Sequence, residues 1–282
     1  MKPLAFAAIY LIWGSTYLAI RIAVGDTPPL LLMGIRCTIA GSLLLAWAAV
    51  RGEWATASQW RHAAFAGALM IAVTYGALAW AEQRLASGTA ALLSAMSPLW
   101  LSTMQWPESG RPALRTIAGL LLGLGGVAML VGGATVAEIN PVAATVLVIG
   151  TLAWAGGSLY ARPPRLPRSS TLGAGMPLLA GGLMLLIVSF ASGELTHYDI
   201  RAISPTSLWA LAYLIVFGSV IAFTAYEWLL RVSPASRVAT HAYVNPLVAV
   251  ALGWSLGGEA VTATTGVAAL AIVASVAVVI RN

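Results

Sequence analysis

Apolar runs of membrane-helix length follow one another along nearly the whole chain. A helix needs about 20 mostly apolar residues to cross a bilayer. Polar and turn-forming segments such as GDTPP (25–29) and WPESGRP (106–112) separate the runs. We therefore predict ten membrane-spanning helices, at residues 4–25, 30–50, 62–82, 86–106, 114–133, 141–162, 172–192, 207–230, 235–257 and 261–280.

Charge supports this pattern and predicts an orientation. Only 9% of the 282 residues are charged, whereas soluble domains carry about 25%. With ten spans, eleven of the 15 Lys and Arg residues fall on the side that holds the N-terminus, which we name side A. The opposite side, side B, receives Arg84 and Arg201. Basic residues favour the cytoplasmic side, so we expect a multi-pass protein of the bacterial inner (plasma) membrane with both termini cytoplasmic.

Two halves of the chain resemble each other weakly. WGSTYLAIR (13–21) is echoed by WAGGSLYAR (154–162), and LASGTAALLSAMSPL (85–99) by SPASRVATHAYVNPL (233–247), in the same order. Five spans in each half, an odd number, would make the second half cross the membrane in the opposite sense. Secondary transporters commonly have such inverted repeats. The alternative is chance resemblance between segments rich in Ala, Gly and Leu.

A family resemblance is carried by five segments: IWGSTYLAIRIAV (12–24), PPLLLMGIR (28–36), AWAEQRLASGTAALLSAMSPL (79–99), FGSVIAFTAY (217–226) and AYVNPLVAVALGWSLGGE (242–259). In these segments the chain resembles the EamA-type members of the drug/metabolite transporter superfamily, and most resembles their YedA-like subgroup. The resemblance implies an all-α membrane protein of ten transmembrane helices in two inverted five-helix repeats, at 1–133 and 141–280. It also implies that spans one, three, four, six, eight and nine surround a central cavity.

The same resemblance implies a function. It suggests an inner-membrane secondary transporter that exports small organic metabolites or drugs, amino acids or similar, by alternating access and with possible proton coupling. The expected partners are a small-molecule solute and the lipid bilayer, in a monomer or homodimer, with no nucleic acid, cofactor or metal. The alternatives are a receptor or scaffold without transport and a membrane-embedded enzyme. The enzyme is disfavoured because HExxH, CxxC and P-loop motifs are absent.

One departure from the family pattern concerns glutamate. Many members carry Gly-Glu at the end of span four, as GGE (257–259) follows span nine here. The matching position in the first half is Arg111. A role assigned to a glutamate at that position therefore does not carry over to this chain.

Two prolines at matching repeat positions predict helix breaks, Pro98 in span four and Pro246 in span nine. A proline inside a helix frees the carbonyl four residues earlier, here those of Ser94 and Ala242. Freed backbone at membrane depth needs protein or a watery cavity to satisfy it, and paired breaks point to a transport site. The alternative is a simple packing kink.

Aromatic residues with polar tips gather in the spans expected around the cavity. A pocket for an organic solute combines apolar walls with a few polar groups. The alternative positions for aromatic residues are the membrane interface or the core. The predicted substrate-binding residues are Trp13, Tyr17, Tyr75, Trp80, Ser94, Ser97, Trp154, Tyr226, Tyr243 and Asn245.

Three charged residues lie within or at the ends of spans near side B: Arg21, Arg36 and Glu82. Charges inside a bilayer usually pair or face a cavity. We therefore expect an ionic cluster that acts as a gate or a substrate anchor, unless the arginines extend to the interface instead.

Two further titratable residues are possible proton sites. His241 is the only histidine predicted in the interior of a span, and histidine titrates near neutral pH. Glu227 is the other candidate. The structural alternatives are a hydrogen-bonded core histidine and a Glu227–Arg231 helix pair at the favourable i, i+4 spacing.

Overall fold

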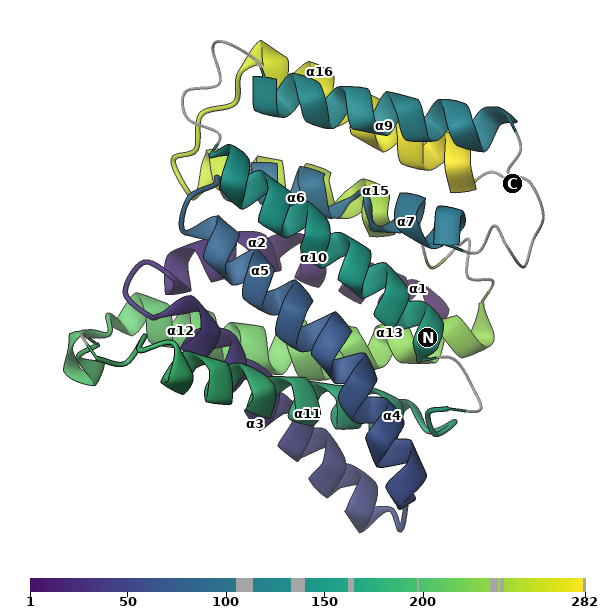
Figure 1. Ribbon diagram of the computed structural model, residues 1–282, viewed down its shortest axis with the longest axis vertical. Coiled ribbons are helices and arrows are strands. Elements are labelled where there is room, and N and C mark those ends of the chain that lie inside the picture. Colours follow the sequence, from purple (N-terminus) through teal and green to yellow (C-terminus); the bar gives the residue numbers. More distant parts are fainter. Residues whose placement is uncertain are drawn as a thin grey trace.

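The described part of the computed structural model is helical and contains no strand (Figure 1). It covers residues 1–104, 114–132, 140–161, 165–196, 198–233, 238 and 241–280. Arg111 lies outside it. The side chains of Arg231 and Tyr243 are also outside it, although their helices are described.

In the first half of the chain, predicted spans one, three and four are each assembled from shorter elements. The first consists of α1 (Lys2–Ala7), the π-helical turn η1 (Ala8–Ile12) and α2 (Trp13–Ala23). The remaining elements are α3 (Pro29–Val50), α4 (Ala57–Gly67), the π-helical turn η2 (Ala68–Val73), α5 (Thr74–Glu82), α6 (Ser87–Ser94), α7 (Ser97–Met104) and α9 (Leu114–Gly132).

The second half contains a third π-helical turn. Its elements are α10 (Pro141–Tyr160), α11 (Ser170–Ala191), the short 3₁₀ turn η3 (Ile200–Ala202), α12 (Pro205–Tyr213), the π-helical turn η4 (Leu214–Ile221), α13 (Ala222–Val232), α15 (His241–Ser255) and α16 (Ala263–Ile280).

Six helices in the described residues are long and apolar enough to cross a membrane. They are Lys2–Ala23, Pro29–Val50, Ala57–Glu82, Pro141–Tyr160, Ser170–Ala191 and Pro205–Leu229. They coincide with predicted spans one, two, three, six, seven and eight. The other four predicted spans fall on shorter described helices, namely α6 with α7, α9, α15 and α16.

The helices start where the sequence carries start signals. Pro29, Pro141 and Pro205 occupy the first turn of their helices, where the missing N–H costs nothing. Thr56 and Gln59 form a reciprocal capping box at the start of α4. These signals set the boundaries of the apolar runs.

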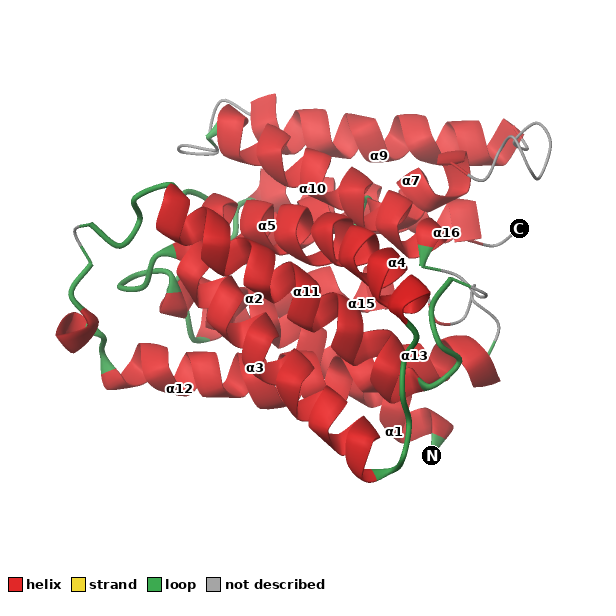
Figure 2. Ribbon diagram, turned by 60° about the horizontal axis from the view of Figure 1, so that its bottom comes forward, coloured by secondary structure: helices red, strands yellow, loops and turns green. Residues whose placement is uncertain are grey.

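The two halves of the chain interlock where α11 packs against α3 and α4 (Figure 2). A Cβ at Gly182 on α11 would lie 2.6 Å from the Thr38 nitrogen, and one at Gly67 on α4 would lie 2.6 Å from the Pro177 oxygen. Small residues at helix crossings let backbones approach in this way. At one edge of the bundle α9 and α16 lie side by side (Figure 1).

Each π-helical turn has a side chain bound to one of its carbonyl groups. Trp13 Nε1 donates to the Gly218 oxygen in η4 at 3.1 Å, and Thr74 Oγ1 donates to the Leu69 oxygen in η2 at 2.8 Å. With its amide oriented to suit its neighbours, the Asn245 nitrogen donates to the η1 oxygens of Ile9 and Tyr10. These bonds stabilise the π-helical turns. Such turns are rare in proteins and often occur at functional sites.

The two prolines expected to break helices behave differently. Span four is interrupted at Ala95 and Met96, and α7 restarts with Ser97 and Pro98. The Ser94 oxygen accepts a hydrogen bond from the Ser97 hydroxyl at 2.9 Å. Pro246 lies inside α15, which continues through it.

Candidate functional site

The centre of the bundle holds an aromatic cluster formed by Trp13, Tyr75, Trp154, Phe223, Tyr226 and His241. Trp13 lies 5.0 Å from Tyr226 and 5.3 Å from His241 between ring centroids. Trp154 lies 6.2 Å from Phe223 in an edge-on arrangement and 6.2 Å from Tyr75 in a stacked one. Rings at these distances attract each other beyond simple burial. The cluster joins α2, α5 and α10 with α13 and α15.

Of the predicted binding residues, several occupy this cluster and others hold the backbone around it. The Trp13 indole N–H and the Asn245 amide nitrogen donate hydrogen bonds to carbonyl oxygens of the π-helical turns. The Tyr17 hydroxyl lies near the Ser94 side chain, beside the break in span four. Trp80 instead packs under the Arg84 guanidinium at 4.0 Å.

The possible proton sites are separate from each other. The His241 ring belongs to the aromatic cluster, and its Nδ1 lies 2.8 Å from the Val238 oxygen. Glu227 is half-buried on α13, and its predicted partner Arg231 has no described side chain. Among the described residues, no group of three His, Cys, Asp or Glu side chains could hold a metal ion.

Arg36 extends from α3 to the edge of the aromatic cluster and is 2% exposed. Its Nε donates to Ser219 Oγ in η4 at 2.9 Å. Its guanidinium carbon lies 4.9 Å from the centroid of the Tyr75 ring, a cation–π contact. A third contact, 3.6 Å long, joins NH1 to the Met33 sulfur. All three partners are neutral.

Glu82 ends α5 and is fully buried. Neither carboxylate oxygen has a hydrogen-bond partner within the described residues. Arg21 approaches, but its NH1 donates to the backbone oxygen of Glu82 rather than to the carboxylate. Arg21 and Arg36 attract the carboxylate electrostatically and Glu259 repels it. The structure thus brings the predicted charges near one another without a direct side-chain ion pair among them.

Two glutamates of the second half bind helix N-termini of the first half, a role that is not among the predicted ones. Glu259 accepts from the Ser87 nitrogen at 2.7 Å and from the Gly88 nitrogen at 3.2 Å at the start of α6. Glu194 likewise accepts from the nitrogens of Leu30 and Leu31 at the start of α3.

These two contacts compensate for missing N-cap side chains at the starts of α6 and α3. Their N-cap residues, Ala86 and Pro28, have no side-chain acceptor for the first backbone N–H groups. A helix N-terminus left this way needs an external partner and attracts negative charge. The absence of Ser, Thr, Asp or Asn at both N-caps was the available sequence signal.

The chain around Glu259 is shaped for this contact. After α15 ends, Gly258 adopts a φ of +65°, which favours glycine. A Cβ on Gly253 would overlap the Glu259 carboxylate and lie 3.0 Å from Ser87 Oγ. The GGE segment therefore ends span nine and stabilises the start of span four.

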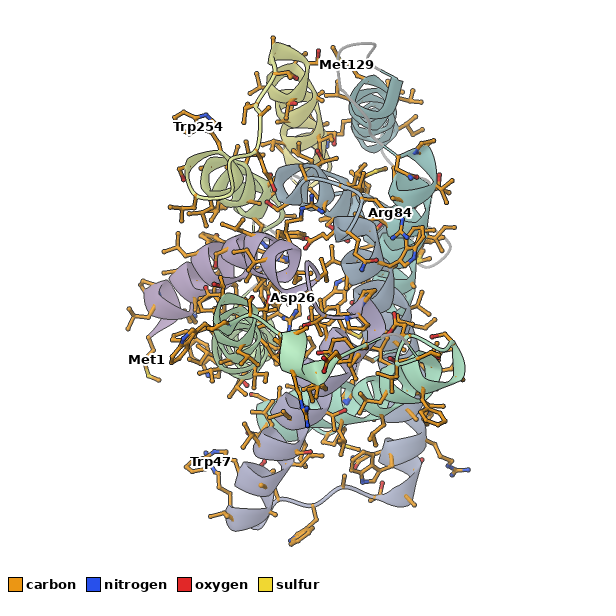
Figure 3. All side chains as sticks on the ribbon, turned by 90° about the vertical axis from the view of Figure 1, so that its left-hand side faces the viewer. Met1, Asp26, Trp47, Arg84, Met129 and Trp254 are labelled. Atoms are coloured by element: carbon orange, nitrogen blue, oxygen red, sulfur yellow. The ribbon has the colours of Figure 1, made fainter. Side chains whose placement is uncertain are left out.

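Asp26 makes a third contact between the halves at the same end of the bundle, where Figure 3 shows it near the middle of the view. Its Oδ2 accepts from the Ser204 nitrogen at 2.9 Å, next to α12. Partial burial opposes ionisation of Asp26, but hydrogen bonds from Ser207, Ser204 and Thr27 outweigh it and lower its pKa. The loop carboxylate is therefore held in its charged form.

Comparisons with known proteins agree on one family. The EamA-like transporter family matches residues 2–132 and again residues 142–281. YedA of Escherichia coli strain K12, described as an uncharacterized inner membrane transporter, is 40% identical over 259 residues, covering 90% of this chain and 82% of YedA. Protein PecM of Dickeya dadantii is 27% identical over 259 residues, covering 90% of this chain and 83% of PecM.

A solved crystal structure supports the fold. It matches with a TM-score of 0.70 at 21% identity, over 99% of this chain and 96% of its own. The relatives and the apolar helices together describe a multi-pass transporter of the inner membrane rather than an enzyme. The chain belongs to the EamA-like transporter family.

Proposed function

We propose that the protein exports small organic solutes by alternating access, with the aromatic cluster as the binding site. The observation that carries this is the position of the cluster, where three interrupted spans meet. Trp13 follows η1, Tyr75 follows η2 and Phe223 follows η4. Non-ideal helices at membrane depth are typical of transport sites, and aromatic walls suit an organic solute.

The proposal includes ten spans in two inverted repeats, residues 1–133 and 141–280, with both termini cytoplasmic. One structural feature supports the repeat. The π-helical turns η2 and η4 begin at Ala68 and Leu214, which are 146 residues apart. The sequence echoes that begin at residues 85 and 233 are 148 apart. The same irregularity thus recurs at matching positions in spans three and eight.

The proposal also includes proton coupling. Glu82, His241 and Glu227 are the candidate carriers, and Glu82 is favoured because its buried carboxylate has no hydrogen-bond partner in the described part of the chain. A pH gradient imposed across proteoliposomes should then change the initial rate of solute uptake. An equal rate with and without the gradient would remove proton coupling from the proposal and leave transport intact.

The experiment that tests transport starts from the purified protein and a panel of amino acids, nucleosides and cationic drugs. A ligand that binds the folded state raises stability by about 2.7 kcal/mol at a hundred times its Kd, so thermal unfolding identifies binders. Each binder is then tested for counterflow in proteoliposomes. Exchange of labelled solute supports the proposal. Binding without exchange would indicate a receptor instead.

A further inference from the structure

We propose that the end of the bundle formed by the last turn of α3, the first turns of α4 and the start of α11 binds the headgroup of an anionic phospholipid. Four exposed arginines make up this region, which we name the arginine surface: Arg51, Arg61, Arg165 and Arg168. None of them belongs to the aromatic cluster, so the proposal does not depend on the proposed transport function.

A small apolar core holds together the segments that carry these arginines. Its buried members come from α3, α4, the segment before α11 and α11 itself: Ala48, Ala63, Leu166, Leu172 and Met176. Leu166 lies between Arg165 and Arg168 in the sequence and is buried, whereas both arginines are exposed. The segment is therefore anchored to the bundle while its two charges remain accessible from outside.

A first series of contacts connects the end of α3 with the start of α11. Arg51 Nε lies 3.7 Å from Glu53 Oε1. The other oxygen of Glu53 accepts a hydrogen bond from the Ser169 hydroxyl, and Ser169 is the N-cap residue of α11. Because Arg168 directly precedes Ser169, these contacts bring Arg51 and Arg168 to the same part of the surface.

A second series of contacts connects the segment before α11 with α4. The guanidinium carbon of Arg165 lies 4.7 Å from the centroid of the Tyr160 ring, and its NH1 donates to the Tyr160 backbone oxygen at 3.2 Å. The Tyr160 hydroxyl lies 2.7 Å from His62 Nδ1 on α4. Arg61 is the neighbour of His62, so Arg165 and Arg61 also share this end of the bundle.

The arginine surface carries an excess of positive charge. In the part of the chain that the structure describes, Glu53 is the only acidic side chain that forms an ion pair with any of the four arginines. The Arg51 side chain in that pair is 59% exposed, and exposed ion pairs contribute little to stability. Arginine binds phosphate oxygens through two parallel N–H groups. The excess charge and this geometry suit the phosphate of a lipid headgroup.

An apolar stripe on α3 leads directly to the arginine surface and favours a lipid over a soluble anion. Its exposed members are Ile39, Leu43, Trp47 and Val50. Residues three or four positions apart lie on one face of a helix, and Figure 3 shows Trp47 pointing away from the bundle. Trp54, in the loop after α3, is 78% exposed. Tryptophan beside basic residues is typical of the membrane interface, where such basic regions bind anionic headgroups.

The test compares three molecules that separate the headgroup charge from the acyl chains. Dioleoyl phosphatidylglycerol is anionic, dioleoyl phosphatidylcholine has the same acyl chains but no net charge, and glycerol 3-phosphate has the phosphate without acyl chains. Native mass spectrometry of the purified full-length protein in neutral detergent measures binding of each. We expect phosphatidylglycerol to bind about tenfold or more tightly than phosphatidylcholine, because each arginine near an anionic headgroup contributes about fivefold. Glycerol 3-phosphate should not bind over the same concentration range.

Two double variants and one control assign the binding to the arginine surface. R61Q/R168Q removes one charge from α4 and one beside α11, and should weaken phosphatidylglycerol about 25-fold while leaving phosphatidylcholine unchanged. R61K/R168K keeps both charges and should retain most of the preference. R201Q removes an exposed arginine beyond the other end of α3, near the contact between Asp26 and Ser204, and should bind as the wild type does. The unfolding temperature without lipid checks that each variant is folded.

Three results would overturn the proposal. Equal binding of the two phospholipids would show that the headgroup charge is not recognised. An equal effect of R61Q/R168Q and R201Q would show that the anionic lipid is not bound at the arginine surface. Binding of glycerol 3-phosphate as tightly as phosphatidylglycerol would show a site for a soluble phosphate compound instead of a lipid.

Discussion

Replacing Glu259 with alanine should destabilise the start of α6. The substitution removes two hydrogen bonds of 2.7 and 3.2 Å to the nitrogens of Ser87 and Gly88. Ala86, at the N-cap, cannot replace them. The loss of an N-cap acceptor costs about 0.5–2 kcal/mol, and the loss of a negative charge at a helix N-terminus about 0.3–1 kcal/mol. The expected total is therefore about 2 kcal/mol.

Glu259→Gln separates the effect of charge from that of hydrogen bonding, because glutamine keeps one neutral acceptor oxygen. It should lose the charge and part of the hydrogen bonding, about half of the alanine effect. Asp199→Ala is a matched control, since Asp199 accepts from the Arg201 nitrogen within its own short turn. A surface change of that kind is usually within about 0.5 kcal/mol.

Two assays measure the effect. Thermal unfolding of the detergent-purified variants should rank the wild type and Asp199→Ala highest, then Glu259→Gln, then Glu259→Ala. Amide hydrogen exchange should show faster exchange in residues 87–94 of the alanine variant. The reasoning is refuted if Glu259→Ala unfolds at the temperature of Asp199→Ala, or if exchange increases elsewhere but not in α6.

Three further changes test other contacts. Gly253→Ala should displace the Glu259 carboxylate, because the new Cβ would overlap it; the double variant with Glu259→Ala should then be less destabilised than the sum of the single effects. Asp26→Asn should lower the unfolding temperature at neutral pH. Hydrogen bonds lower the pKa of Asp26 in the folded protein. The ionised carboxylate therefore stabilises the fold above its unfolded pKa, near 3.8, and this stabilisation is lost as pH falls through the lower folded pKa. The difference in unfolding temperature between Asp26→Asn and the wild type should therefore disappear at acidic pH. Gly41→Ala should cost about 1–3 kcal/mol, because the added Cβ would lie 2.8 Å from the Leu179 Cα; an unchanged unfolding temperature would show that α3 and α11 are not packed so closely.

The parts of the fold that depend on length and polarity could be predicted from the sequence. The runs at 30–50 and 172–192 lie within a few residues of α3 and α11, since apolar runs of that length form membrane helices. Arg36 could be singled out because a charge in such a run is costly. These inferences need only local composition.

The site residues that the sequence does not reveal are brought into place by contacts between distant segments of the chain. Phe223 and Ser219 lie in or just after η4, and a π-helical turn changes which residues share a face, so regular helix periodicity does not place them. Glu259 and Glu194 resemble ordinary loop charges until the helices they cap, from the other half of the chain, are known. Only its span places Trp80 with the predicted site, and in the structure the Arg84 guanidinium covers its ring.

The most direct test of the central claim is counterflow through the aromatic cluster. Labelled solute exchange is measured in proteoliposomes containing the wild type, Trp154→Ala, Trp154→Phe or Trp209→Ala. Trp154 belongs to the cluster, whereas Trp209 on α12 is 77% exposed. We predict exchange by the wild type, Trp209→Ala and, at a reduced rate, Trp154→Phe, with loss in Trp154→Ala at equal folded protein. Full exchange by Trp154→Ala, or equal loss in Trp209→Ala, would contradict the account.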